Sequence, residues 1–363
     1  MNKIEEFVNQ FPSKHTKNSY RCFLNNYFNT IRENPETYFN DNRDYEKDVL
    51  TYWESLKDKA PLTKSQALSC IKVFLQEYDI DLKTKFLKKL KRRSKGSGTR
   101  PLTLDKVPNP KQLKEILQHG NIQSRALFLI ASSSGCRIDE ILQLKTEYID
   151  FKSDPVTINI PGSITKTGES RVAFISNEAA DTLKEWLKVR KEYLIFAVKK
   201  CNHKNVKKKF HKNIDDPYIF PFSYNNSRDI WNRLINKADY KEKDTSTGRY
   251  RYHIHSLRKY FRTRLGSEIP VDVVEVLMGH SGYLTGAYRR YSMEQLKDFY
   301  KKGVHALMIF EKQPDLTGVH EEMQKLRNEK DKEIQRLNQR IEMLDQNLRT
   351  LMITEIGKVK KKD

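Results

Sequence analysis

The sequence predicts a mainly helical protein with one small antiparallel sheet, an α+β class. Along most of the chain, apolar residues recur every three or four positions, as on the buried face of a helix. One stretch changes period, where VTINI and RVAFIS flank a Lys-Thr-Gly-Glu turn. Short apolar runs around such a turn are typical of two strands joined by a tight connection. With 363 residues, of which 37% are hydrophobic, the chain is long enough for two packed domains.

Residues 1–93 are expected to form a small helical domain, because no alternating apolar run interrupts the helical pattern. SKHTKNSYRCFLNNYFNTI offers Ser13 or Thr16 as an N-cap. Its apolar side chains then fall on one face: Tyr20, Phe23, Leu24, Tyr27 and Phe28. LTKSQALSCIKVFLQEY repeats the pattern with Leu68, Ile71, Phe74 and Leu75.

A basic linker is predicted at residues 94–108. Nine basic residues lie between Lys83 and Arg100, and Gly96, Gly98 and three prolines follow by Pro110. Glycine and proline in this density mark a flexible connection. The unbroken positive charge indicates a hinge that also lies against phosphates. The candidate phosphate-binding side chains are Lys91, Arg92, Arg93 and Lys95.

Residues 109–312 are expected to form a second, mixed domain, which holds the strands. NPKQLKEILQHG and SRALFLIASSSGCRIDEILQL predict two helices before the strands, and NEAADTLKEWLKVRKEYLIFAV predicts one after them. A loop with seven lysines runs from Lys199 to Lys212 and is interpreted as a solvated insertion. Further helical stretches follow, among them YHIHSLRKYFRTRL, which runs from Tyr252 to Leu265.

The tail, residues 313–363, carries the a/d pattern of a coiled coil. Its apolar residues alternate steps of three and four: Ile334, Leu337, Ile341, Leu344, Leu348 and Leu351. An amphipathic helix packed on its own protein is the alternative. Charged residues at most other positions favour a helix that pairs with a second copy or with another partner.

The charge balance points to a polyanionic partner. The chain has 68 Lys and Arg against 47 Asp and Glu, a formal net charge of +21. Counterion release makes nucleic acid the leading candidate. An anionic membrane surface is the competitor, but the sequence has no apolar run of spanning length. MNKIEEFVNQFPSKHTK lacks the apolar core of a secretory signal, so a cytoplasmic location is expected.

Neither disulfides nor a metal site are expected. Cys22, Cys70, Cys136 and Cys201 are scattered and form no CxxC pair. Cys201, His203 and His211 could suggest a metal cluster, but a fourth ligand is missing and lysines crowd the segment. The solvated basic loop is therefore the preferred interpretation.

Several short motifs could hold a phosphate and act on it. His255 and Arg258 lie three residues apart, on one face of a helical turn. A guanidinium can grip two phosphate oxygens, and an imidazole can exchange a proton with a third. Arg137 follows a glycine near a helix start, where backbone N–H groups also favour anions, and Glu140 could orient it. Lys166 lies at the strand turn, and GHS supplies His280.

In this order, the arginine, the lysine on a β-turn, HSLR, GHS and a late tyrosine resemble the tyrosine recombinase (phage integrase) family. The resemblance covers roughly Ser13 to Phe310 and is most specific over His255 to Tyr291. LMGHSGYLTGAYRRYS, followed by LKDFYKKGVHAL, is more similar to archaeal integrases. The family resemblance implies two domains, a helical core-binding domain that contacts duplex DNA and a catalytic domain. It also implies that the protein forms tetramers on two DNA sites.

The resemblance also implies roles for these residues. Arg137 and Arg258 would bracket the scissile phosphate, and His280 would add a hydrogen bond. His255 would assist removal of the tyrosine proton, and Lys166 would protonate the leaving 5′ oxygen. Neither a cofactor nor a metal ion is needed. The attack would give a 3′-phosphotyrosyl intermediate.

The nucleophile departs from the usual family spacing. It commonly lies nine residues after the GH histidine, where this chain has Arg289. Tyr288 is one residue short and Tyr291 two residues long. The AYRRYS context resembles archaeal relatives in which the first tyrosine aligns with the nucleophile, which favours Tyr288.

The expected function is site-specific recombination, for integration or excision of a mobile element. A type IB topoisomerase-like enzyme would use a similar residue set but would act as a monomer without strand exchange. A non-catalytic architectural DNA-binding protein would explain the charge alone. A covalent protein–DNA adduct distinguishes the enzymes from the architectural protein.

Overall fold

The computed structural model describes residues 2–40, 43–93, 104–202, 213–245, 247–280, 291–310, 329–330 and 332–344. The chain forms two compact units. The first comprises Met1–Leu104 with Thr245–Thr247, and the second comprises Asp105–Asp244 with Gly248–Asp363. Each unit has its own apolar core. The mainly helical class with a small antiparallel sheet, predicted from the sequence, is confirmed.

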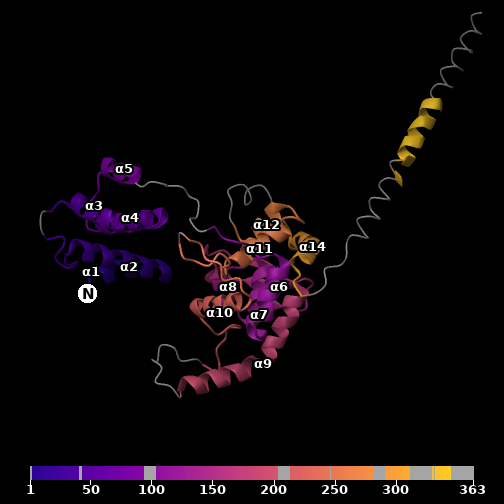
Figure 1. The fold of residues 1–363 in the computed structure, drawn as a ribbon, viewed down its shortest axis with the longest axis horizontal. Helices are drawn as coiled ribbons and strands as arrows, with labels where there is room; N and C mark the ends of the chain where they lie inside the picture. The colour runs from indigo at the N-terminus through magenta and orange to yellow at the C-terminus, as the bar shows by residue number, and fades with distance from the viewer. Residues whose placement is uncertain are drawn as a thin grey trace, which may run out of the picture. The chain divides into compact units, whose positions relative to one another are not determined.

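The first unit is built from helices alone in its described part (Figure 1). They are α1 (Lys3–Asn9), α2 (Lys14–Ile31), α3 (Tyr45–Ser55), α4 (Pro61–Gln76) and α5 (Thr84–Arg93). Ser13 is the N-cap of α2, and its side chain accepts a hydrogen bond from the Thr16 backbone. The predicted apolar faces of α2 and α4 supply most of this core.

Helix α5 presents basic side chains at its C-terminal end. Leu90 is buried against the helical core, whereas Lys91 and Arg92 are exposed. The side chain of Arg93, and the whole of Lys95, lie outside the described residues.

The second unit surrounds helix α7 (Figure 1). Helix α6 (Pro110–Gln118) precedes α7 (Ile122–Ser134), which packs against α9 (Asn177–Asn202) and α11 (Ser256–Leu265). Helices α10 (Tyr224–Lys237), α12 (Val271–Met278) and α14 (Met293–Gly303) also belong to this unit. Between Cys136 and Tyr148 lie only the short α8 (Ile138–Leu142) and a 3₁₀ turn, Thr146–Tyr148.

The sheet contains the two predicted strands and one that the sequence pattern missed. β2 (Val156–Ile160) and β3 (Arg171–Ile175) pair antiparallel, with Ile158 opposite Ala173. β1 (Ile149–Asp150) adds two residues to the other side of β2. It is too short to show an alternating pattern. The prediction of a tight connection was wrong, because ten residues separate β2 from β3. These ten residues include a 3₁₀ turn, Gly162–Ile164.

Two other boundaries differ from the sequence patterns. Helix α9 extends to Asn202, so Lys199 continues a helix rather than beginning a loop, and residues 203–212 lie outside the described part. Helix α11 begins only at Ser256, which makes His255 its N-cap. In the tail, residues 332–344 are helical, and all of their side chains are exposed. Leu348 and Leu351 lie outside the described residues, so the coiled coil stays a prediction.

Gly135 ends α7 in a backbone conformation that the packing also requires. Its φ is +63°, and a Cβ at this position would lie 2.4 Å from the Phe261 ring of α11. Left-handed backbone favours glycine because other L-residues lose roughly 1 kcal/mol or more there. Glycine therefore allows α7 to stop beside α11.

We expect Gly135→Ala to lower the free energy of unfolding of the second unit by roughly 2 kcal/mol or more, from backbone strain together with overpacking. Gly248→Ala is the matched control, because Gly248 has φ +66° and open space around its Cβ position. Chemical denaturation of the full-length variants measures both. Equal losses would show that the contact with Phe261 contributes nothing.

Candidate active site

Arg258 is the centre of a cluster that joins three segments of the second unit. It lies on α11, one turn after the N-cap, and is only 4% exposed. Its guanidinium donates to the carbonyl of Gly135 and, over 2.7 Å, to that of Met278. Nη2 also lies 2.8 Å from Nε2 of His280. The turn after α7 and the end of α12 are thereby held against α11.

Burial and like charge act together on Arg258. Removal from water and the nearby guanidinium groups of Arg137 and Arg171 lower the pKa of Arg258 to about 10. The group therefore stays charged at neutral pH. Among the described residues, no carboxylate is in contact with it.

Arg137 approaches the same place from the start of α8. It is the N-cap residue, and its backbone N–H donates to Glu140 over 2.8 Å. Its side chain also contacts Glu140, at 3.1 Å. Glu140 is 2% exposed. Its Oε2 also accepts a hydrogen bond from Nη2 of Arg171 over 2.5 Å. The predicted orientation of Arg137 by Glu140 is thus present.

Arg171, the first residue of β3, is a member of the cluster that sequence reasoning missed. Its Nη1 donates to the carbonyl of Leu277 on α12 over 2.9 Å. Gly279 makes room for it, because a Cβ there would lie 2.4 Å from the Arg171 side chain. Arg137 and Arg171 consequently share one buried carboxylate, whereas Arg258 lies near them without a carboxylate partner among the described residues. The cluster has surplus positive charge and can bind an anion such as a phosphate.

His280 is oriented from both ring nitrogens. Because arginine can only donate, Nε2 of His280 accepts from Arg258, and Nδ1 donates to Glu275. Glu275 also contacts Arg262 at 2.5 Å. Burial opposes ionisation of Glu275, but hydrogen bonds from His280 and Arg262 outweigh it and lower the pKa of this carboxyl. No motif in the sequence marks Glu275.

His255 stands at the N-terminal end of α11 and is exposed. Partial removal of its ring from water, and the positive charges of His253, Arg258 and Lys259, lower its pKa. The imidazole is therefore neutral at pH 7 and can accept a proton.

Lys166 and the two tyrosines complete the sequence-predicted set. Lys166 is exposed in the connection between β2 and β3, five residues before Arg171. Among the described residues no ion pair holds its ammonium group. Tyr288 lies outside the described residues. Tyr291 is half-buried, and its ring packs edge-on against Phe299 with centroids 5.8 Å apart. The structure thus brings together Arg137, Arg258 and His280.

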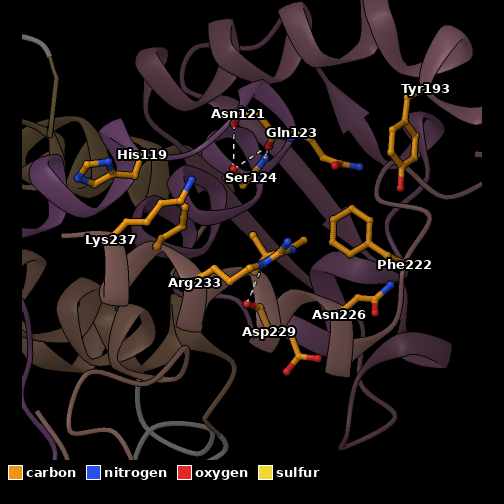
Figure 2. Close-up of a pocket in the computed structure, with 12 residues that line it drawn as sticks. His119, Asn121, Gln123, Ser124, Tyr193, Phe222, Asn226, Asp229, Arg233 and Lys237 are labelled. Carbon is orange, nitrogen blue, oxygen red and sulfur yellow. Dashed lines mark hydrogen bonds between the residues drawn. The ribbon is translucent and has the colours of Figure 1, made fainter. Parts of the chain in front are cut away.

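A cavity of about 600 Å³ lies elsewhere in the second unit. Figure 2 shows Gln123 and Ser124 of α7, Tyr193 of α9 and Arg233 of α10 around it. None of its lining residues belongs to the arginine–histidine cluster. The chemistry is therefore not placed in this cavity.

Three cysteines of the described part of the chain have no disulfide partner. Cys22, Cys70 and Cys136 are free. In the described part of the chain, no group of three His, Cys, Asp or Glu side chains could hold a metal ion. Cys201, His203 and His211 are not among the residues whose side chains are described. No helix within the described ranges is long and apolar enough to cross a membrane.

Solved structures share this fold at low sequence identity. A lambda integrase tetramer bound to a Holliday junction is 13% identical, with a TM-score of 0.54 over 80% of this chain and 78% of that chain. Lambda integrase bound to DNA is 13% identical, with a TM-score of 0.52 over 83% of this chain and 95% of that chain. The Tn1549 transposon integrase in complex with circular intermediate DNA is 16% identical, with a TM-score of 0.50 over 82% of this chain and 98% of that chain. No curated protein matches the chain in sequence.

The family comparison covers the cluster itself. Residues 106–295, more than half of the chain, match the phage integrase family. This range holds Arg137, Lys166, His255, Arg258 and His280. The chain belongs to the phage integrase family, the tyrosine recombinases.

Proposed function

We propose that this protein is a site-specific DNA recombinase, which cleaves and rejoins duplex DNA through a 3′-phosphotyrosyl intermediate. Integration or excision of a mobile element is the process that such an activity serves. The proposal rests chiefly on the excess of positive charge in the arginine–histidine cluster. Glu140 pairs with Arg137 and Arg171, and the buried Arg258 contacts no carboxylate among the described residues. A scissile phosphate would supply the missing negative charge. We place the activity in the cytoplasm, on DNA.

In the proposed reaction, the hydroxyl oxygen of Tyr288 attacks the scissile phosphorus, and the bond to the 5′ oxygen breaks. His255 accepts the tyrosine proton, and Lys166 gives a proton to the leaving oxygen. Arg137 and Arg258 stabilise the charge that builds on the non-bridging oxygens. His280, held by Glu275 through Nδ1, adds a hydrogen bond from Nε2 once this nitrogen is protonated and turns from Arg258 to the phosphate. Religation reverses each transfer, so the phosphodiester energy is kept.

The environment of Tyr291 supports Tyr288 as the nucleophile. A nucleophile must bring its hydroxyl to the phosphate, whereas the Tyr291 ring packs on Phe299 and on the core of the second unit. That environment suits an aromatic packing residue.

Tyr288→Phe should abolish the covalent protein–DNA adduct while DNA binding persists, because only the hydroxyl is removed. Tyr291→Phe is the matched control and should keep the adduct. Nicked duplexes that tile the DNA flanking the gene, resolved on a denaturing gel, provide the assay. Adduct formed by the Tyr288 variant but not by the Tyr291 variant would reverse the assignment. Adduct from neither wild type nor variants would favour an architectural protein.

Assembly into tetramers on two DNA sites is the second part of the proposal, with the tail as a self-association helix. Ile334, Leu337 and Ile341 are 54%, 55% and 61% exposed on helix 332–344. Together with Leu344 they form one apolar stripe, whose exposure is costly unless a partner helix covers it. In a parallel coiled coil, isoleucine at a positions with leucine at d positions favours two strands.

Leu337→Glu with Ile341→Glu should lower self-association and the joining of two DNA sites, and leave the adduct on a single site intact. Gln335→Glu with Gln339→Glu adds the same charge outside the stripe and is the control. Light scattering with and without DNA measures the mass. If all variants keep the wild-type mass, the tail does not drive assembly. Recombination between sites, as opposed to relaxation of supercoils alone, separates the recombinase from a topoisomerase.

A further inference from the structure

The second unit begins at Asp105, and this side chain is tied directly to the start of α11. The carboxylate is 12% exposed; one oxygen lies 2.9 Å from Nε2 of His253, and the other contacts Nζ of Lys259. Burial of Asp105 opposes its ionisation, but Lys259 and His253 outweigh it and lower the pKa of the carboxyl. Asp105 is therefore an anion that holds two cationic or polar groups in place.

The two partners of Asp105 flank His255, two residues before it and four residues after it. The rings of His253 and His255 lie parallel, at 6° with centroids 6.2 Å apart. The carbonyl of His253 accepts from the backbone N–H of Ser256 at 2.8 Å and from its hydroxyl at 2.6 Å. Fixing His253 and Lys259 thus fixes the turn that carries His255 and the first turn of α11.

We propose that Asp105 is a positioning residue for His255: its carboxylate holds His253 and Lys259, and through them sets where the His255 ring stands during strand cleavage. The inference rests on the proposed function and names a residue that touches neither DNA nor the reacting atoms. The first residue of the second unit thus helps to position His255, the proposed proton acceptor.

A neighbouring carboxylate provides a matched control. Glu242 contacts Nζ of Lys106 at 2.5 Å and Nη1 of Arg251 at 2.9 Å. The Lys106 backbone N–H also donates to the carbonyl of Arg251 over 3.0 Å. Glu242 therefore anchors the same entry segment with two ion pairs. Within the described part of the chain, it makes no ion pair or hydrogen bond with His253, Lys259 or α11.

A double-mutant cycle with His255 tests the proposal, because groups that act through one another give non-additive effects. Asp105→Ala in the full-length protein should slow single-turnover adduct formation about tenfold. This is less than the factor of about 10²–10⁴ that general acid–base catalysis supplies, because His255 is displaced and not removed. DNA affinity should not change. In a His255→Ala background, Asp105→Ala should cause no further loss. Glu242→Ala should have the same small effect in both backgrounds.

His253→Ala is the second variant, and it removes the ring nitrogen that contacts Asp105 while Asp105 keeps Lys259. It should show the same non-additivity with His255→Ala. Additive losses for both Asp105→Ala and His253→Ala, or an Asp105 effect equal to that of Glu242, would overturn the positioning role. Failure of the wild-type protein to form any adduct would instead count against the proposed function.

Discussion

The guanidinium of Arg258 is the constraint on which the second unit depends. A buried cation must find acceptors or lose several kcal/mol of solvation, and Arg258 finds them in the carbonyls of Gly135 and Met278 and in His280. These partners lie at the end of α7 and at the end of α12. The hydrogen bonds therefore set the distance between segments that are far apart in the sequence.

The positions of Gly135 and Gly279, and the pairing of Arg137 and Arg171 with Glu140, are consistent with that constraint. Gly135 can expose its carbonyl to Arg258 only where α7 stops in left-handed backbone beside Phe261. Gly279 leaves space for Arg171, which shares Glu140 with Arg137. The cluster is thereby held together by groups of the protein itself, with positive charge in excess. Preorganised charge of this kind stabilises a transition state without reorganisation at the moment of reaction.

Local sequence patterns predicted several of the helices and strands and part of the arginine–histidine cluster. The 3.6-residue period identified α2 and α4, and the period change identified β2 and β3. Glycine followed by Arg137, and the HSLR and GHS motifs, marked members of the cluster. Arg171, Glu275 and Asp105 could not be found in this way, because their partners lie far along the chain or carry no motif. The ten-residue connection between β2 and β3 was mistaken for a tight turn because its Lys-Thr-Gly-Glu residues are those of a hairpin.

Arg258→Lys tests the central role of this guanidinium most directly. Lysine keeps the charge but lacks the planar fork, so it cannot bond Gly135, Met278 and His280 together while it faces a phosphate. The measurement is the single-turnover rate of adduct formation beside the DNA dissociation constant, with thermal unfolding to confirm folding. We predict that the rate falls by about 10² or more, as for loss of an oxyanion donor, with affinity nearly unchanged. A variant that folds and cleaves at the wild-type rate would contradict it.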